Sequence, residues 1–147
     1  MAGVSPRSPA VDISFSTKER RSARRVLREM SSEGRVARGL SLEELLTTWT
    51  RFVTEVEAGY RRSVYEYADD LSVRDILQEV MDQGAEPLRG KLTAWLKLWD
   101  DRFVNATLPV SNPLDSSARP AALARISRIP RKLVAELEAD LAAEGLQ

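Results

Sequence analysis

The carboxylate side chains between Glu66 and Asp82 are the residues whose spacing could hold a metal ion. Glu66, Asp69 and Asp70 are followed by Glu79 and Asp82, with a three-residue helical step in each group. Acids on neighbouring helices hold a hard cation such as Mg²⁺ only when they project into the space between those helices. On a helical wheel, Asp69 lies about 180° and Glu66 about 120° from the centre of the apolar stripe. We therefore interpret these acids as a solvated surface and expect no metal site.

The chain of 147 residues contains no cysteine and no histidine, which excludes several kinds of site. Thiolate nucleophiles, disulfides, imidazole bases and the commonest zinc ligands cannot form. The motifs GxSxG, GxGxxG and GxxxxGK[ST] do not occur either. We expect no catalytic residue, no cofactor and no enzymatic activity. A small hydrolase that uses carboxylates and a metal ion is kept as the second alternative.

The arginines are unevenly distributed, although the whole chain carries 22 basic and 22 acidic residues. Residues 1–40 contain nine basic and four acidic residues, a net charge of +5. Residues 41–110 contain eight basic and thirteen acidic residues, a net charge of −5. A basic segment of this kind can pair with the acidic body of its own chain, with a second copy, or with another anionic partner.

The candidate partner-binding residues come from three places in the sequence. The first group lies opposite the apolar stripe of an amphipathic segment over residues 17–31. A second basic group lies at the start of the predicted last helix, where the helix dipole disfavours positive charge and an anion could compensate it. One tyrosine falls outside the aromatic stripe and is expected to be exposed. The candidates are Arg20, Arg21, Arg24, Arg25, Arg28, Tyr65, Arg128, Arg131 and Lys132.

Apolar periodicity predicts helices along the chain and no strand. In GLSLEELL, Ser41 and Glu44 form a capping box, and the apolar spacing after it continues for about seven turns. In DLSVRDIL, Ser72 and Asp75 repeat the same signal and predict the start of another helix. The expected helices cover residues 17–31, 41–68, 72–84, 87–106 and 130–144.

Eight of the nine aromatic residues lie between Trp49 and Phe103. Most of them share the apolar stripes of the predicted helices, which indicates a core and not a ligand pocket. The residues expected in this core are Trp49, Phe52, Tyr60, Tyr67, Trp95, Trp99 and Phe103.

The patterns together predict an all-α protein, a small helical bundle of three core helices plus a C-terminal helix, with a flexible basic N-terminal arm. We find no apolar run long enough for a signal peptide or a membrane span, and expect a soluble, cytoplasmic protein that does not contact a membrane. The predicted segments are a disordered leader (1–16), a basic amphipathic arm (17–39), a helical core (41–108), a mobile loop (109–120) and a C-terminal helical segment (121–147).

For function, we expect a non-enzymatic interaction or regulatory protein. It would bind another protein, or a second copy of itself, through its amphipathic helices. The first alternative is an antitoxin-like regulator that binds nucleic acid through the arginine-rich arm.

Overall fold

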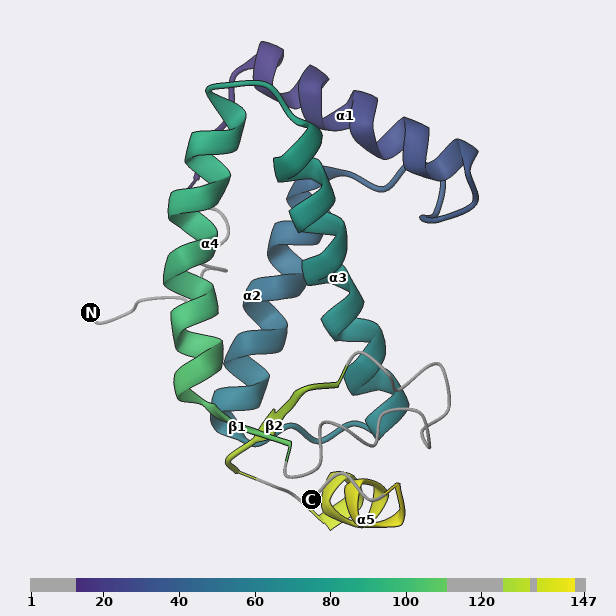
Figure 1. Ribbon diagram of the computed structural model, residues 1–147, viewed down its shortest axis with the longest axis vertical. Helices are drawn as coiled ribbons and strands as arrows, with labels where there is room; N and C mark the ends of the chain where they lie inside the picture. The colour runs from purple at the N-terminus through teal and green to yellow at the C-terminus, as the bar shows by residue number, and fades with distance from the viewer. Residues whose placement is uncertain (1–12, 111–125, 133–134, 145–147) are drawn as a thin grey trace, which may run out of the picture.

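Helices make up most of the part of the chain that the structure describes (Figure 1). The computed structural model describes residues 13–110, 126–132 and 135–144. The helices are α1 (Thr17–Ser32), α2 (Leu42–Ala58), α3 (Val64–Gln83), α4 (Leu88–Asn105) and α5 (Ala135–Ala143), and the strands are β1 (Thr107–Pro109) and β2 (Arg128–Pro130). The prediction of an all-α helical bundle is confirmed, with a small sheet added to it.

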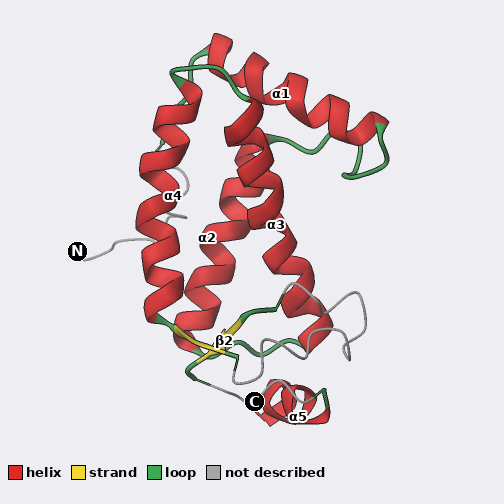
Figure 2. Cartoon of the chain, in the orientation of Figure 1, coloured by secondary structure: helices red, strands yellow, loops and turns green. Residues whose placement is uncertain are grey.

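Three long helices form the body of the bundle. Figure 2 shows α2, α3 and α4 running side by side along the long axis, and each of them contacts the other two. α1 crosses one end of this body, while the small sheet and α5 lie at the opposite end (Figure 1). The two basic groups of the sequence are therefore placed at opposite ends of the molecule.

The prediction of one continuous helix over residues 41–68 is wrong, because the chain breaks at Gly59. Gly59 has φ +110°, which ends α2 and which other residues rarely adopt. α3 then begins after Ser63, whose hydroxyl accepts from the backbone N–H of Glu66 in a capping box. Ser72, expected to begin the next helix, lies inside α3 and donates to the carbonyl of Asp69. The apolar spacing continues across the break, so periodicity alone did not reveal it.

The small sheet is a second correction, because no strand was expected. β1 and β2 pair antiparallel, with Leu108 opposite Ile129. The last helix was predicted to start at Pro130, but Pro130 ends β2 and α5 begins only at Ala135. Strands of three residues are too short to show an alternating pattern. The predicted mobile loop over 109–120 lies outside the described residues from position 111 onward.

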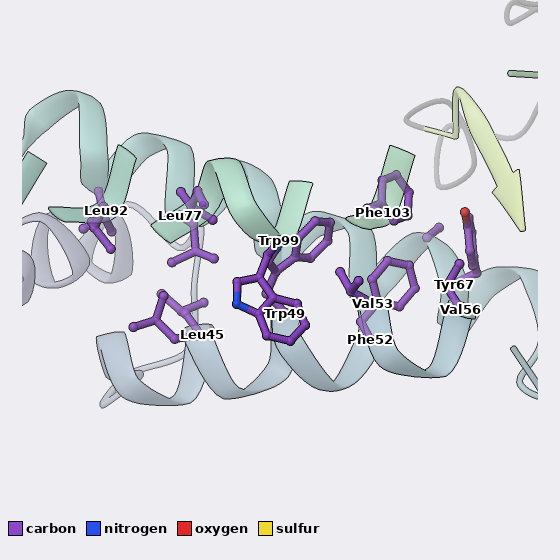
Figure 3. Close-up of a cluster of buried hydrophobic side chains, with 14 of the residues drawn as sticks. Leu45, Trp49, Phe52, Val53, Val56, Tyr67, Leu77, Leu92, Trp99 and Phe103 are labelled. Atoms are coloured by element: carbon purple, nitrogen blue, oxygen red, sulfur yellow. The ribbon is translucent and has the colours of Figure 1, made fainter. Parts of the chain in front are cut away.

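The aromatic core is present as predicted, and all seven expected residues are buried. Phe52 lies at its centre, with its ring 5.3 to 5.8 Å from the rings of Trp49, Tyr60, Tyr67 and Phe103. Figure 3 shows side chains of this cluster meeting between the helices. These ring separations are typical of favourable aromatic pairs.

α1 is part of the fold. Its apolar stripe is buried against the bundle, and Phe15 just before the helix is also buried. Ser16 and Glu19 form a capping box at its start, a signal that our sequence analysis did not use. Residues 17–39, predicted as a flexible arm, therefore include a packed helix, and residues 13–16 do not fit a disordered leader. Residues 1–12 lie outside the described part. The buried stripe consists of Ala23, Val26, Leu27 and Met30.

We predict that Trp49→Ala lowers the free energy of unfolding by about 3 to 5 kcal/mol, because it leaves a cavity beside Phe52. The matched control is Tyr65→Ala, since the Tyr65 side chain is 48% exposed. It should change the stability by less than about 0.5 kcal/mol. Urea denaturation followed by circular dichroism measures both, and equal effects would contradict the assignment of Trp49 to the core.

We predict opposite effects for alanine at two glycines. Gly59→Ala should destabilise the protein by about 1 kcal/mol or more, because the φ of +110° is strained for alanine. Gly90→Ala should stabilise it by about 0.5 kcal/mol, because Gly90 lies inside α4 and its new Cβ meets only the flexible end of Glu86. Thermal denaturation of the two variants tests the contrast.

Candidate functional site

The exposed surface of α1 is strongly basic. Because the apolar stripe faces the bundle, the charged residues between its members face outward. Two acidic residues lie in α1, and of these Glu19 is buried while Glu29 is exposed. Six exposed basic side chains therefore share this helix with one exposed acid: Lys18, Arg20, Arg21, Arg24, Arg25 and Arg28.

A groove of about 820 Å³ runs beside α1 and is the candidate functional site. One wall is α1, and the other is the segment that leads from Arg38 into the first turn of α2. Gly34 and Gly39 both have positive φ, which turns the chain back alongside α1. The charged groups that line the groove are Arg20, Arg24, Arg28, Arg38 and Glu43, and the apolar ones are Ala23, Leu27, Leu40 and Leu42.

Only one arginine of the groove has an ion-pair partner among the described residues. The Nε atom of Arg20 lies 3.3 Å from a carboxylate oxygen of Glu43, and both side chains are more than half exposed. An exposed pair of this kind is usually worth less than about 1 kcal/mol. Arg24, Arg28 and Arg38 make no hydrogen bond or ion pair with the described part of the chain. The groove therefore presents three guanidinium groups that are open to an anion.

Other arginines near α1 hold the helix on the body. Arg25 donates to the backbone carbonyl of Gln83 at the end of α3. Arg35 donates to both carboxylate oxygens of Glu79, at 2.8 and 3.4 Å, and this guanidinium keeps the pKa of Glu79 below its usual value. Of the predicted arm candidates, Arg25 thus has a structural contact, whereas Arg21 has no partner among the described residues.

Glu19 and Lys91 tie the start of α1 to α4. The Glu19 carboxylate is buried, and one of its oxygens accepts from Lys91 Nζ at 2.9 Å and from the backbone N–H of Ser16 at 2.7 Å. The hydrogen bond from Lys91, followed by that from Ser16, lowers the pKa of Glu19. Lys91 also donates to the carbonyl of Ser14. The position of α1, and so of the groove, depends partly on this contact.

The second basic group has a different location from the one predicted. Arg128 lies in β2, and Arg131 and Lys132 follow it, so none of them is at the start of α5. Arg128 donates to the carbonyls of Val104 and Thr107, and Arg131 donates to the carbonyl of Asn105. Positive charge at the C-terminal end of α4 is favourable. The unfavourable placement that suggested an anion here is therefore absent.

Tyr65 is exposed, as predicted, but it lies in the first turn of α3, at the end of the bundle opposite α1 (Figure 1). It therefore takes no part in the groove. Arg131 and Lys132 line a separate hollow of about 290 Å³ near the C-terminal end of α4. The candidates that the structure brings together at the groove are Arg20, Arg24 and Arg28.

The acids weighed as metal ligands do not converge. Asp70 accepts a 2.7 Å hydrogen bond from the Tyr60 hydroxyl, Glu79 contacts Arg35, and the Glu66 carboxylate accepts from the backbone N–H of Ser63 at the start of its own helix. Among the residues that the structure describes, no group of three acids is placed to hold a metal ion.

Arg38, Leu27, Leu40 and Leu42 line the groove but were not among the predicted site residues. Arg38 was counted in the charge of the arm, but its position opposite α1 depends on the turn between Gly34 and Gly39. Two glycines close to an arginine-rich helix were the available signal.

Comparison of the chain with protein-family models, with curated proteins and with solved structures finds no match. Within the described residues, no helix is both long and apolar enough to span a membrane.

We predict that Glu19 makes the stability depend on pH on the acid side of its ordinary pKa of 4.5. Because the folded protein holds the pKa lower, the ionised carboxylate stabilises the fold above pH 4.5, and this contribution is lost as the pH falls through the folded value. Melting temperatures measured at decreasing pH should fall more steeply for the wild type than for Glu19→Gln. The exposed Glu44→Gln is the matched control and should keep the slope of the wild type.

Proposed function

We propose that this protein is a non-enzymatic binding protein that receives an acidic segment of a protein partner in the groove beside α1. The observation that carries the proposal is the set of three arginines, Arg24, Arg28 and Arg38, which face one groove without an anionic partner among the described residues. Guanidinium groups form paired hydrogen bonds with carboxylates, so an acidic segment supplies the missing contacts.

Docking through an exposed apolar helix face has less support than the sequence suggested. The apolar stripe of α1 is buried within its own chain, and Leu137 and Leu141 of α5 are fully buried as well. The surface that α1 leaves to a partner is its arginine side. Charge complementarity therefore replaces apolar docking as the basis of the proposed interaction.

The surroundings of the groove favour an acidic protein segment over a nucleic acid. Glu29 and Glu33 are exposed near the C-terminal end of α1, and Glu43 and Glu44 are exposed in the first turn of α2. A duplex places a phosphate charge about every 1.7 Å along its axis, so its backbone would pass close to these acids. A protein segment can place its carboxylates only where the arginines are. A regulatory role in the cytoplasm is the setting that we propose for this interaction.

We predict that the full-length protein binds fluorescently labelled poly-L-glutamate at low salt, and that Arg24→Gln/Arg28→Gln weakens this binding by about tenfold or more. Fluorescence anisotropy measures the affinity. The matched control is Arg61→Gln, because Arg61 is an exposed arginine outside the groove with no partner among the described residues.

Two results would contradict the proposal. In the first, the double variant and Arg61→Gln bind poly-L-glutamate equally well, so the groove is not the site. In the second, a short DNA duplex binds more tightly than poly-L-glutamate and depends on the same two arginines. That outcome would select the nucleic-acid alternative.

A further inference from the structure

The spacing of the groove residues specifies the kind of acidic segment that fits, an inference that rests on the proposed function. We infer that the groove takes an α-helix of the partner, with acidic residues four positions apart and a leucine-like residue three positions after the first acid. In sequence terms, the partner carries acid-x-x-leucine-acid on one helical face.

The α1 wall of the groove carries the same spacing, with arginines in place of the acidic residues. Arg24, Leu27 and Arg28 all line the groove, at positions i, i+3 and i+4 of one helix. Residues at this spacing share a face, and the two arginines are separated by about 6 Å along the axis. Arg20 adds a third position one turn earlier. A partner helix that lies along α1 has its own i and i+4 side chains at the same separation.

Arg20, Arg24 and Arg28 form a row along α1. Glu43 shows that a carboxylate carried by a helix reaches this row. It belongs to the first turn of α2, and its carboxylate lies 3.3 Å from Arg20. Arg24 and Arg28 are the next two positions of the row and have no such carboxylate among the described residues. The contact between Arg20 and Glu43 is thus an internal example of the pairing that the partner would extend.

The apolar floor distinguishes a helix from an extended peptide. Leu40 lines the groove beside the arginines and is only partly buried, so a partner with only acidic side chains would leave its exposed surface uncovered. In an extended strand, residues i and i+2 face the same side and the residue between them faces away. An extended segment with an acid at each arginine therefore has no side chain to place on Leu40. A helix puts an acid, an apolar residue and a second acid on one face.

The size of the groove agrees with this occupant. The row from Arg20 to Arg28 extends about 12 Å, a little more than two helical turns. Arg38 on the opposite wall reaches the same space. Two turns of a partner helix match the length of the site.

The test compares three labelled probes on the full-length protein. The first peptide repeats the acid-x-x-leucine-acid pattern with glutamate as the acid. The second peptide has the same composition, but its glutamates and leucines alternate along the chain. The third probe is poly-L-glutamate of equal length. We expect the first peptide to bind at least about tenfold more tightly than the other two and to gain helical circular dichroism on binding. Its affinity should fall about tenfold in Arg24→Gln/Arg28→Gln and stay unchanged in Arg61→Gln.

The outcomes separate this inference from the proposed function. If all three probes bind equally, with the same dependence on Arg24 and Arg28, the inference that the partner segment is helical is wrong. The proposal that the partner segment is acidic is then still supported. If none of the probes binds, the proposed function fails and the inference fails with it.

Glu43→Gln provides an independent variant, since Glu43 is exposed and its replacement leaves the core intact. Removing this carboxylate frees Arg20, so a pattern peptide with three acids should bind about threefold more tightly, a gain within the range of one exposed ion pair. An unchanged affinity would overturn the assignment of Arg20 to the row.

Discussion

The packing of aromatic rings around Phe52 is the contact on which the rest of the structure depends. This ring meets Trp49 of its own helix, Tyr67 of α3 and Phe103 of α4, so it joins the three long helices at one point. Tyr60 joins the same cluster from the loop between α2 and α3. A continuous helix could not bend back to place α3 against α2, so the cluster requires the break at Gly59. The phenol of Tyr67 then donates to the carbonyl of Arg128, which ties β2 to the core. Burial raises the pKa of Tyr67, so its hydroxyl remains a neutral donor.

The position of α1 follows from the same requirement to bury apolar surface, and it determines where the positive charge goes. With Val26 and Leu27 against the bundle, the arginines of α1 have only the solvent side and the groove available. The contact between the buried Glu19 carboxylate and the Lys91 ammonium adds a specific anchor at the start of the helix. The positive charge of residues 1–40 is thus partly paired with the negative charge of residues 41–110, through Arg35 with Glu79 and through Arg20 with Glu43. At the groove, several arginines lie close together without an anionic partner among the described residues.

The two basic groups of the sequence differ in what they do, although their compositions are alike. Arg128 and Arg131 are engaged with backbone carbonyls near the C-terminal end of α4, where they stabilise a helix end and the small sheet. Arg24 and Arg28 have no such partners among the described residues. The C-terminal end of a helix exposes carbonyl groups that need hydrogen-bond donors, whereas the carbonyl groups along the side of a helix are already hydrogen-bonded. This difference separates arginines that complete the fold from arginines that are open to a partner.

The sequence by itself determined the helical class, the aromatic core, the apolar stripe of α1 and the basic character of its opposite face, because these depend on residues close together in the chain. It also identified Tyr65 as exposed. The apolar spacing is the same on both sides of Gly59 and therefore did not reveal where the long helix breaks, although Gly59 and the capping box of Ser63 and Glu66 are local signals of the break. Only the tertiary structure decided that Pro130 ends a strand, because β2 exists only through its pairing with β1. The groove depends on Arg38 and Leu40 returning alongside Arg24 and Arg28, a contact between segments that no local pattern encodes.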